Sequence, residues 1–183
     1  DDFYYTDSHW RQERILTVSD EIADKMGAER IGQCEKHDTG VSFYGVYYGQ
    51  AALPHAPESF FYLDNAVIRG LKVYNVENSS DIPVYDLRAA AGRDPYEMFF
   101  GGARSIIRIT NPNAANERRL VVFRDSFGSC IAPLLAAGYT EITLVDIRYI
   151  APTALGRLID FMKTDDALFL YSASVINNSE TIK

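Results

Sequence analysis

The sequence contains few of the residues that build metal sites or disulfide frameworks. Among its 183 residues there are two cysteines, three histidines and one tryptophan. The two cysteines, Cys34 and Cys130, are too few for a disulfide framework and show no metal-ligand spacing. We therefore expect two unpaired thiols, with a single disulfide as the alternative. The sequence indicates no metal and no other cofactor.

Basic residues and long apolar runs are also scarce. Lysine and arginine number 18 against 25 aspartates and glutamates, so the formal net charge is −7. A nucleic-acid partner normally requires a basic face, and this charge balance argues against one. The uncharged, mainly apolar stretch from Ser126 to Thr140 is shorter than the ~20 residues that span a bilayer. We therefore expect no transmembrane segment in this chain.

The length and the hydrophobic content are those of one globular domain. A chain of 183 residues fits the usual domain size of roughly 100–200 residues. Its 47% hydrophobic residues suffice for a sizeable core. The chain begins at Asp1 without an initiator methionine or a signal sequence. We expect residues 1–183 to be a single domain, the C-terminal part of a longer protein, whose fold can be incomplete at its N-terminus.

The second half of the sequence predicts strands that alternate with helices. Continuous runs of β-branched and aromatic residues indicate buried strands, and segments with apolar residues at helical spacing separate them. The expected strands are 118–125, 141–147 and 166–172, and the expected helices are 126–139, with Gly138 as its C-cap, and 151–163. Strand-helix-strand order predicts parallel strands joined by right-handed crossovers, and therefore an α/β fold.

The first half is less regular. The pattern predicts a helix over 9–27 that ends at Gly27, strands over 66–77 and 82–87, and a short helix over 94–100.

One serine lies at the end of a predicted strand. Ser126 follows the apolar run 120–123, and ligands of open α/β sheets bind beyond the carboxyl ends of the strands. A serine in such a turn lies beside helix-start amides, which can stabilise an oxyanion, and it becomes a nucleophile when a base takes its proton. The alternative is that Asp125 and Ser126 only cap the helix. The G-x-S-x-G motif is not matched, because position 124 is Arg.

A histidine near the N-terminus could supply the base. Asp7 and His9 are two residues apart. Histidine suits general-base work near neutral pH, and a carboxylate at its other ring nitrogen would fix the tautomer. Trp10 could then form a wall of the pocket. The alternative is a helix start capped by Asp7 or Ser8, and we expect His37 and His55 in loops.

Five segments in order resemble the bacterial DHHW family. They are TDSHW, YEMFFGGARSIIRI, VVFRDSFGSCIAPLL, EITLVDIRYI and ALFLYS. That family in turn resembles the circularly permuted SGNH-hydrolase fold of the alginate O-acetyltransferases. The resemblance implies a three-layer SGNH-hydrolase-like sandwich with a mainly parallel sheet. By position it makes Ser126 the nucleophile, His9 the base and Asp7 the residue that orients His9.

The resemblance also implies binding residues around the triad. SGNH enzymes generally supply an oxyanion donor from an Asn in a Gly-x-Asn block, but the matching region 101–103 has no Asn. Backbone amides near Gly102 are expected to substitute. Arg148 and Tyr149 match the family's Arg-Tyr pair, and Arg148 is expected to bind an anionic group, with an ion pair to Asp146 or Asp125 as the alternative. Arg124 is either a cation of the site or a structural partner of Asp125.

Three functions are compatible with the sequence. The first is a serine-dependent acyl (acetyl) transferase or esterase that acts on a cell-envelope or exopolysaccharide carbohydrate through an acyl-enzyme. The second is a non-catalytic carbohydrate-binding or scaffold domain that uses some of the 12 tyrosines and 10 phenylalanines as sugar platforms. The third is a structural domain of a larger envelope protein. The family resemblance implies an extracytoplasmic location, and the sequence identifies no partner protein.

Overall fold

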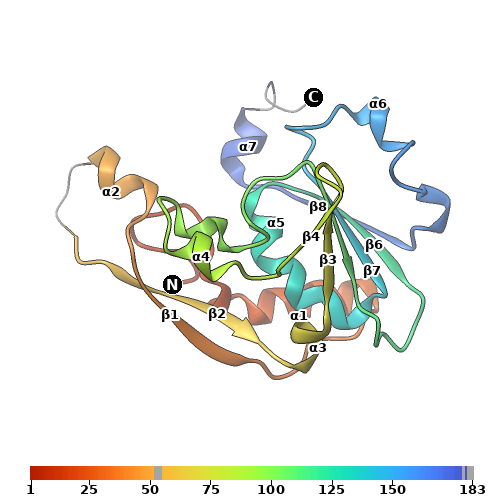
Figure 1. Ribbon diagram of the computed structural model, residues 1–183, viewed down its shortest axis with the longest axis horizontal. Coiled ribbons are helices and arrows are strands. Elements are labelled where there is room, and N and C mark those ends of the chain that lie inside the picture. Colours follow the sequence, from red (N-terminus) through yellow and green to blue (C-terminus); the bar gives the residue numbers. More distant parts are fainter. Residues whose placement is uncertain (52–54, 179, 181–183) are drawn as a thin grey trace.

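The computed structural model describes residues 1–51, 55–178 and 180. Within this part of the chain, six strands form one mixed sheet and two further strands pair beside it (Figure 1). The order of the large sheet is β4-β3-β5-β7-β6-β8. Its strands are β3 (Lys72–Asn75), β4 (Ser80–Ile82), β5 (Ile106–Thr110), β6 (Arg119–Arg124), β7 (Glu141–Val145) and β8 (Asp166–Leu170).

The chain is an α/β protein, but its large sheet is not mainly parallel. Strand β6 pairs in parallel with β7 and with β8, as the strand-helix-strand rhythm predicts. The pairs β5–β7, β3–β5 and β3–β4 are antiparallel. The expectation of a mainly parallel sheet is therefore wrong. The physical reason lies partly in the short turn between β3 and β4, because neighbouring strands joined without a crossover must run antiparallel.

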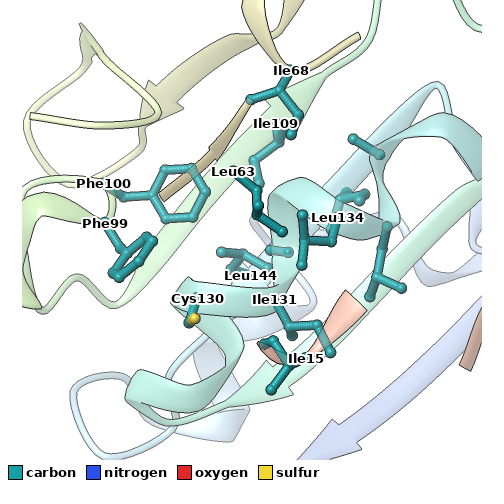
Figure 2. Packing of buried hydrophobic residues seen from close by; sticks show 14 of the residues in the cluster. Ile15, Leu63, Ile68, Phe99, Phe100, Ile109, Cys130, Ile131, Leu134 and Leu144 are labelled. Atoms are coloured by element: carbon teal, nitrogen blue, oxygen red, sulfur yellow. The ribbon is translucent and has the colours of Figure 1, made fainter. Parts of the chain in front are cut away.

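The two faces of the sheet are covered unequally. Helices α1 (Leu16–Met26), α3 (Ala66–Gly70), α5 (Ser126–Ile131) and the 3-10 helix η3 (Ala132–Gly138) pack on one face. Figure 2 shows this cluster, with Ile131 and Leu134 close to Leu144 of β7. A smaller cluster on the other face contains Val121, Val145 and Leu155 of α6 (Pro152–Leu155). Strand alternation explains the division, because successive side chains point to opposite faces.

The first predicted helix begins later than expected. The segment 9–27 contains a short 3-10 helix, η1 (Gln12–Arg14), and then α1, while His9 and Trp10 lie outside both. The predicted end is confirmed, because Gly27 adopts a left-handed conformation with φ 62° and its N–H caps α1.

Local capping explains several other differences from the sequence pattern. The predicted strand 66–77 is α3 followed by β3, because the Asn65 side chain accepts from the Ile68 N–H and starts a helix. The predicted strand 82–87 is wrong beyond Ile82, since Pro83 has no N–H for the sheet and Asp86 caps α4 (Leu87–Ala90). The short helix near 94–100 is confirmed as the 3-10 helix η2 (Pro95–Met98), capped by Asp94.

The two segments predicted as long helices are both divided. Residues 126–138 form α5 and then η3, in which Gly138 is the last residue and not the cap. The segment 151–163 contains only α6 and the 3-10 helix η4 (Phe161–Lys163), so the predicted amphipathic helix is wrong. A short helix, α7 (Ala173–Asn177), follows β8.

The smaller sheet consists of β1 (Glu35–Phe43) and β2 (Glu58–Asp64), which pair antiparallel. Helix α2 (Val46–Ala51) follows β1. His37 lies in β1 and stacks on Tyr62, so its predicted place in a loop is wrong, whereas His55 lies outside regular structure as expected. Both cysteines are free thiols, which confirms the first of the two alternatives.

Candidate active site

Ser126 is the first residue of α5. It follows the N-cap residue Asp125, which directly follows the end of β6. The Asp125 carboxylate accepts from the Phe127 N–H at 3.0 Å and from the Ser172 N–H at 2.7 Å. Asp125 therefore caps the helix and ties the turn to the segment after β8. The Ser126 side chain is left to make a different contact.

That contact is with the N-terminal segment. His9 Nε2 lies 2.8 Å from Ser126 Oγ, across a sequence separation of 117 residues. His9 Nδ1 lies 2.5 Å from Asp7 Oδ1. The two fragments that the sequence singled out thus meet in space, with the imidazole between the carboxylate and the hydroxyl.

The surroundings of Asp7 favour the ionised form of its carboxyl group. Burial by itself raises the pKa of the Asp7 carboxyl, but hydrogen bonds from the His9 side chain and from the backbone N–H groups of Val46 and His9 outweigh it and lower the pKa below its ordinary value. An ionised Asp7 accepts from His9 Nδ1–H. In the tautomer with the proton on Nδ1, the Nε2 lone pair faces the Ser126 hydroxyl, which is the geometry that a general base requires.

Aromatic rings hold the histidine in place. The Tyr96 ring of η2 stacks on the His9 ring with a centroid distance of 4.0 Å and an angle of 21°. The Tyr96 hydroxyl donates to the Trp10 carbonyl at 3.2 Å, and burial raises the Tyr96 pKa well above its ordinary value, so the hydroxyl stays a donor. Trp10 is not among the residues that line the pocket described below. Its ring packs edge-on against Phe127 at 4.7 Å.

A pocket of about 210 Å³ opens beside Ser126, at the carboxyl ends of β6 and β7. Its walls combine apolar and polar groups and carry charged side chains of both signs. The residues that line it are His9, Asp94, Tyr96, Glu97, Phe99, Gly102, Ala103, Arg124, Ser126, Ser129, Arg148 and Tyr149.

Arg148 lines the pocket and forms an ion pair with Asp146. Its Nε and Nη2 donate to the two carboxylate oxygens of Asp146 at 2.9 and 2.7 Å. This is one of the two alternatives that the sequence left open, and the hydrogen-bonded carboxylate raises the pKa of Arg148. Asp146 therefore already engages Nε and Nη2 of the Arg148 guanidinium. Binding of a substrate anion by the remaining N–H groups of Arg148 stays a prediction. Tyr149, which is 53% exposed, lies beside Arg148 in the pocket.

Arg124 is buried beneath the pocket, with an exposed fraction of 1%. Its guanidinium donates to Ser129 Oγ at 3.0 Å and to the carbonyls of Asp125 and Arg104 at 3.3 Å. Burial lowers its pKa, and the carboxylate of Asp146, 3.8 Å away, counteracts this. Arg124 thus holds the turn at Ser126 in place and also lines the pocket.

The amide of Gly102 does not face the site as a free donor. The Gly102 N–H donates to the Phe99 carbonyl at 3.3 Å, so this particular amide is not free to bind an oxyanion. Phe100, Gly101 and Gly102 have φ values of 60°, 70° and 90°, and this left-handed run turns the backbone at the pocket edge. The Phe127 N–H is likewise bound to Asp125. The N–H of Ser126 itself lies in the first turn of α5, where amides have no intrahelical acceptor.

Several residues of the site were not singled out as site residues from the sequence. Tyr96, Glu97 and Asp94 come from a short helix whose local pattern says nothing about a distant histidine. The Val46 amide, which donates to Asp7 Oδ2 at 2.9 Å, comes from the start of α2, outside the main sheet. Only the tertiary structure brings them to the site.

The ion pair below the pocket leads to a stability prediction. Replacement Asp146→Ala would leave the buried Arg124 and the Arg148 fork without their carboxylate. Breaking a buried pair in this way typically costs about 3–5 kcal/mol. We expect a large loss of stability in urea denaturation. Asp24→Ala, which removes the partner of the exposed Arg30, is the control and should change stability little. Equal stabilities for the two variants would contradict the structural role of Asp146.

Neither a metal site nor a membrane span is present in the described residues. Within 1–51, 55–178 and 180, no group of three or more His, Cys, Asp or Glu side chains could hold a metal ion. None of the helices in the same residues combines the length and the apolar character that a bilayer span needs.

Fold and site together define an α/β protein in which the side chains of Asp7, His9 and Ser126 form a hydrogen-bonded chain. This chain lies at the carboxyl end of β6. The chain belongs to the DHHW family, because the family model described as "DHHW protein" matches residues 2–145. This range includes Asp7, His9 and Ser126 but ends before Arg148 and Tyr149. No curated protein matches the sequence.

Solved structures show the same fold. A DHHW family protein from Eubacterium siraeum superimposes with a TM-score of 0.73 at 20% identity, covering 98% of this chain and 62% of that one. Bacillus cereus PatB1 with a sulfonyl adduct gives a TM-score of 0.74 at 21% identity, covering 96% and 62%. A second PatB1 structure gives 0.70 at 21% identity, with 96% and 64% covered. The chain thus spans less than two thirds of the length of these proteins.

Proposed function

We propose that this protein is a serine-dependent acyl (acetyl) transferase or esterase that acts on an extracytoplasmic carbohydrate. One observation carries the proposal. His9 lies within hydrogen-bond distance of both Asp7 and Ser126, at 2.5 and 2.8 Å. Residues so far apart in sequence have no local reason to adopt this geometry, whereas nucleophilic catalysis requires it.

The geometry allows a two-step reaction. His9 Nε2 takes the Ser126 proton as Oγ attacks the ester carbonyl, and the imidazolium then gives that proton to the departing alcohol. The acyl group is left on Ser126. A sugar hydroxyl or water, deprotonated by His9, attacks this ester, and the imidazolium returns the proton to Ser126 Oγ as the acyl bond breaks. Asp7 stays ionised throughout and stabilises the imidazolium.

The oxyanion donor in this proposal is the Ser126 N–H. It is the first amide of α5, and the helix-start position favours negative charge. One such donor typically contributes ~10²–10³ in rate. Because the Gly102 and Phe127 amides are engaged, further stabilisation would come from the cationic side of the pocket, where Arg124 and Arg148 lie.

Family membership and fold support the reaction class. The DHHW family resembles the circularly permuted SGNH-hydrolase fold of the alginate O-acetyltransferases. We propose that the six-stranded sheet, with helices packed on both of its faces, is a three-layer sandwich of that kind. The carbohydrate substrate and the extracytoplasmic location rest on this resemblance. A PatB1 structure carries a sulfonyl adduct. Because an activated serine attacks the electrophilic sulfur of a sulfonyl reagent and displaces its leaving group, such reagents are suitable probes here.

The proposal is tested by trapping the acyl-enzyme. After incubation with p-nitrophenyl acetate and acid quench, peptide mass spectrometry should find one acetyl group on Ser126. A sulfonyl fluoride or fluorophosphonate should block the same residue, and pretreatment should prevent acetylation. Ser19, a buried serine of α1, is the internal control and should carry no label. Added oligosaccharides that accelerate p-nitrophenol release would distinguish transfer from hydrolysis. An unlabelled Ser126 in folded protein would argue against the proposal.

A non-catalytic carbohydrate-binding domain is the second candidate. The specific observation in its favour is that the Gly102 amide is engaged and that no Asn occupies 101–103, which weakens the oxyanion site. Exposed tyrosines such as Tyr5, Tyr44 and Tyr47 could serve as sugar platforms. Glycan-array binding without any serine labelling would support this candidate.

A further inference from the structure

The segment that carries Asp7 and His9 is anchored to the smaller sheet. Glu58 Oε2 at the start of β2 accepts from the N–H groups of Tyr5 at 2.8 Å and Thr6 at 3.3 Å. The Tyr4 ring packs on Phe43 of β1 with a centroid distance of 4.3 Å. Figure 1 shows the N-terminus beside β1 and β2. The orientation of the proposed base therefore depends on a sheet that contains no residue of the pocket.

A turn after β1 makes the contact closest to the chemistry. Three successive N–H groups of this turn donate to the Asp7 segment. Gly45 N–H bonds Thr6 Oγ1 at 3.0 Å, Val46 N–H bonds Asp7 Oδ2 at 2.9 Å, and Tyr47 N–H bonds the Thr6 carbonyl at 2.9 Å.

Glycine permits this close approach. A Cβ at position 45 would lie 2.1 Å from the Thr6 carbonyl oxygen and 2.4 Å from Asp7 Cβ. Both distances are far inside van der Waals contact, so a side chain at position 45 would push the turn away from Asp7. The close contact between this turn and Asp7 therefore requires the absence of a side chain at position 45.

We propose that the Gly45–Val46 turn is a positioning element of the active site, in which the Val46 N–H holds one oxygen of Asp7 so that the other faces His9 Nδ1. A carboxylate rotates in a broad torsional well, so fixing Oδ2 also fixes Oδ1. The Val46 side chain is 49% exposed and does not line the pocket, so its amide carries the effect. The catalytic meaning of this inference rests on the proposed function.

Two substitutions at the same position separate the amide from the side chain. Val46 is the first residue of α2, where the fixed φ of proline fits the helix. Proline removes the N–H and also places its ring Cδ toward Asp7 Oδ2, so both changes act on the carboxylate. Val46→Ala should keep kcat within about twofold of the unmodified protein, as expected of an exposed side chain. Val46→Pro should lower kcat roughly 10- to 100-fold with little change in KM, as for loss of a hydrogen bond to a charged group. Thermal unfolding of both variants controls for damage to the fold.

A measurement that needs no turnover separates this inference from the proposed function. The proton between His9 Nδ1 and Asp7 should give a low-field ¹H NMR resonance in the unmodified protein and in Val46→Ala. It should shift or broaden in Val46→Pro. If Val46→Pro does not fold, the α-hydroxy acid analogue of valine at position 46 replaces N–H by O and keeps the side chain. An unchanged resonance and an unchanged kcat without the Val46 N–H would overturn the inference. Ester turnover that survives Ser126→Ala would instead overturn the proposed function, and the NMR comparison would still decide the role of Val46.

Discussion

Replacement Ser126→Ala is expected to abolish ester turnover, with a loss of roughly 10⁴-fold or more in kcat. The hydroxyl lies 2.8 Å from His9 Nε2 and is the nucleophile that the imidazole can activate. Without it, no acyl-enzyme forms, and water would have to attack directly. Rates of p-nitrophenyl acetate hydrolysis and fluorophosphonate labelling measure the effect.

The loss should occur without unfolding. The helix cap is provided by Asp125, and the Ser126 side chain does not take part in it. Thermal unfolding of the Ser126→Ala variant should therefore resemble that of the unmodified protein. Ser19→Ala is the matched control, because Ser19 is a buried helical serine whose hydroxyl donates to the Leu16 carbonyl, away from the pocket. Equal turnover by the two variants would remove Ser126 from the mechanism.

Replacement Asp7→Asn is expected to lower kcat by roughly 10²–10⁴-fold. The Asp7 carboxylate accepts from the N–H and Nδ1 of His9 and from the Val46 N–H. An amide has one acceptor oxygen, so it cannot satisfy both sides. If its oxygen faces Val46, its NH₂ group faces His9 and favours the tautomer with the proton on Nε2. That tautomer cannot accept the Ser126 proton. Asp86→Asn, at the cap of α4, is the control and should retain activity.

The same substitution has a predicted pH signature in stability. The folded-state pKa of Asp7 lies below its ordinary value of 3.8. A depressed pKa stabilises the fold above the unfolded-state pKa, and this contribution is lost as the pH falls through the folded-state pKa. The unmodified protein should therefore be more stable than Asp7→Asn at neutral pH. Urea denaturation should show the difference shrinking as the pH falls below 3.8. A difference that does not depend on pH would contradict an ionised, hydrogen-bonded Asp7.

Signals carried by neighbouring residues predicted much of the fold. Strands β6, β7 and β8 lie where unbroken β-branched and aromatic runs placed them, and Gly27 ends α1 as expected. The failures have local causes as well. An Asn65 cap turned part of a predicted strand into α3, and the segment 151–163 stayed largely irregular although its apolar spacing favoured a helix. The mixed sheet could not be predicted, because strand order and direction depend on pairings between distant segments.

By itself, the sequence determined the α/β class and the two fragments of the candidate site. Those fragments are recognisable because a carboxylate two residues from a histidine and a serine after a strand are local patterns. Only the tertiary structure decided that His9 meets Ser126, that Asp146 occupies the Arg148 fork, and that the Gly102 amide is engaged. It also brought the Val46 amide to Asp7. The physical reason is that hydrogen bonds between distant segments depend on the packing of the whole sheet and its helices, which local residue spacing does not encode.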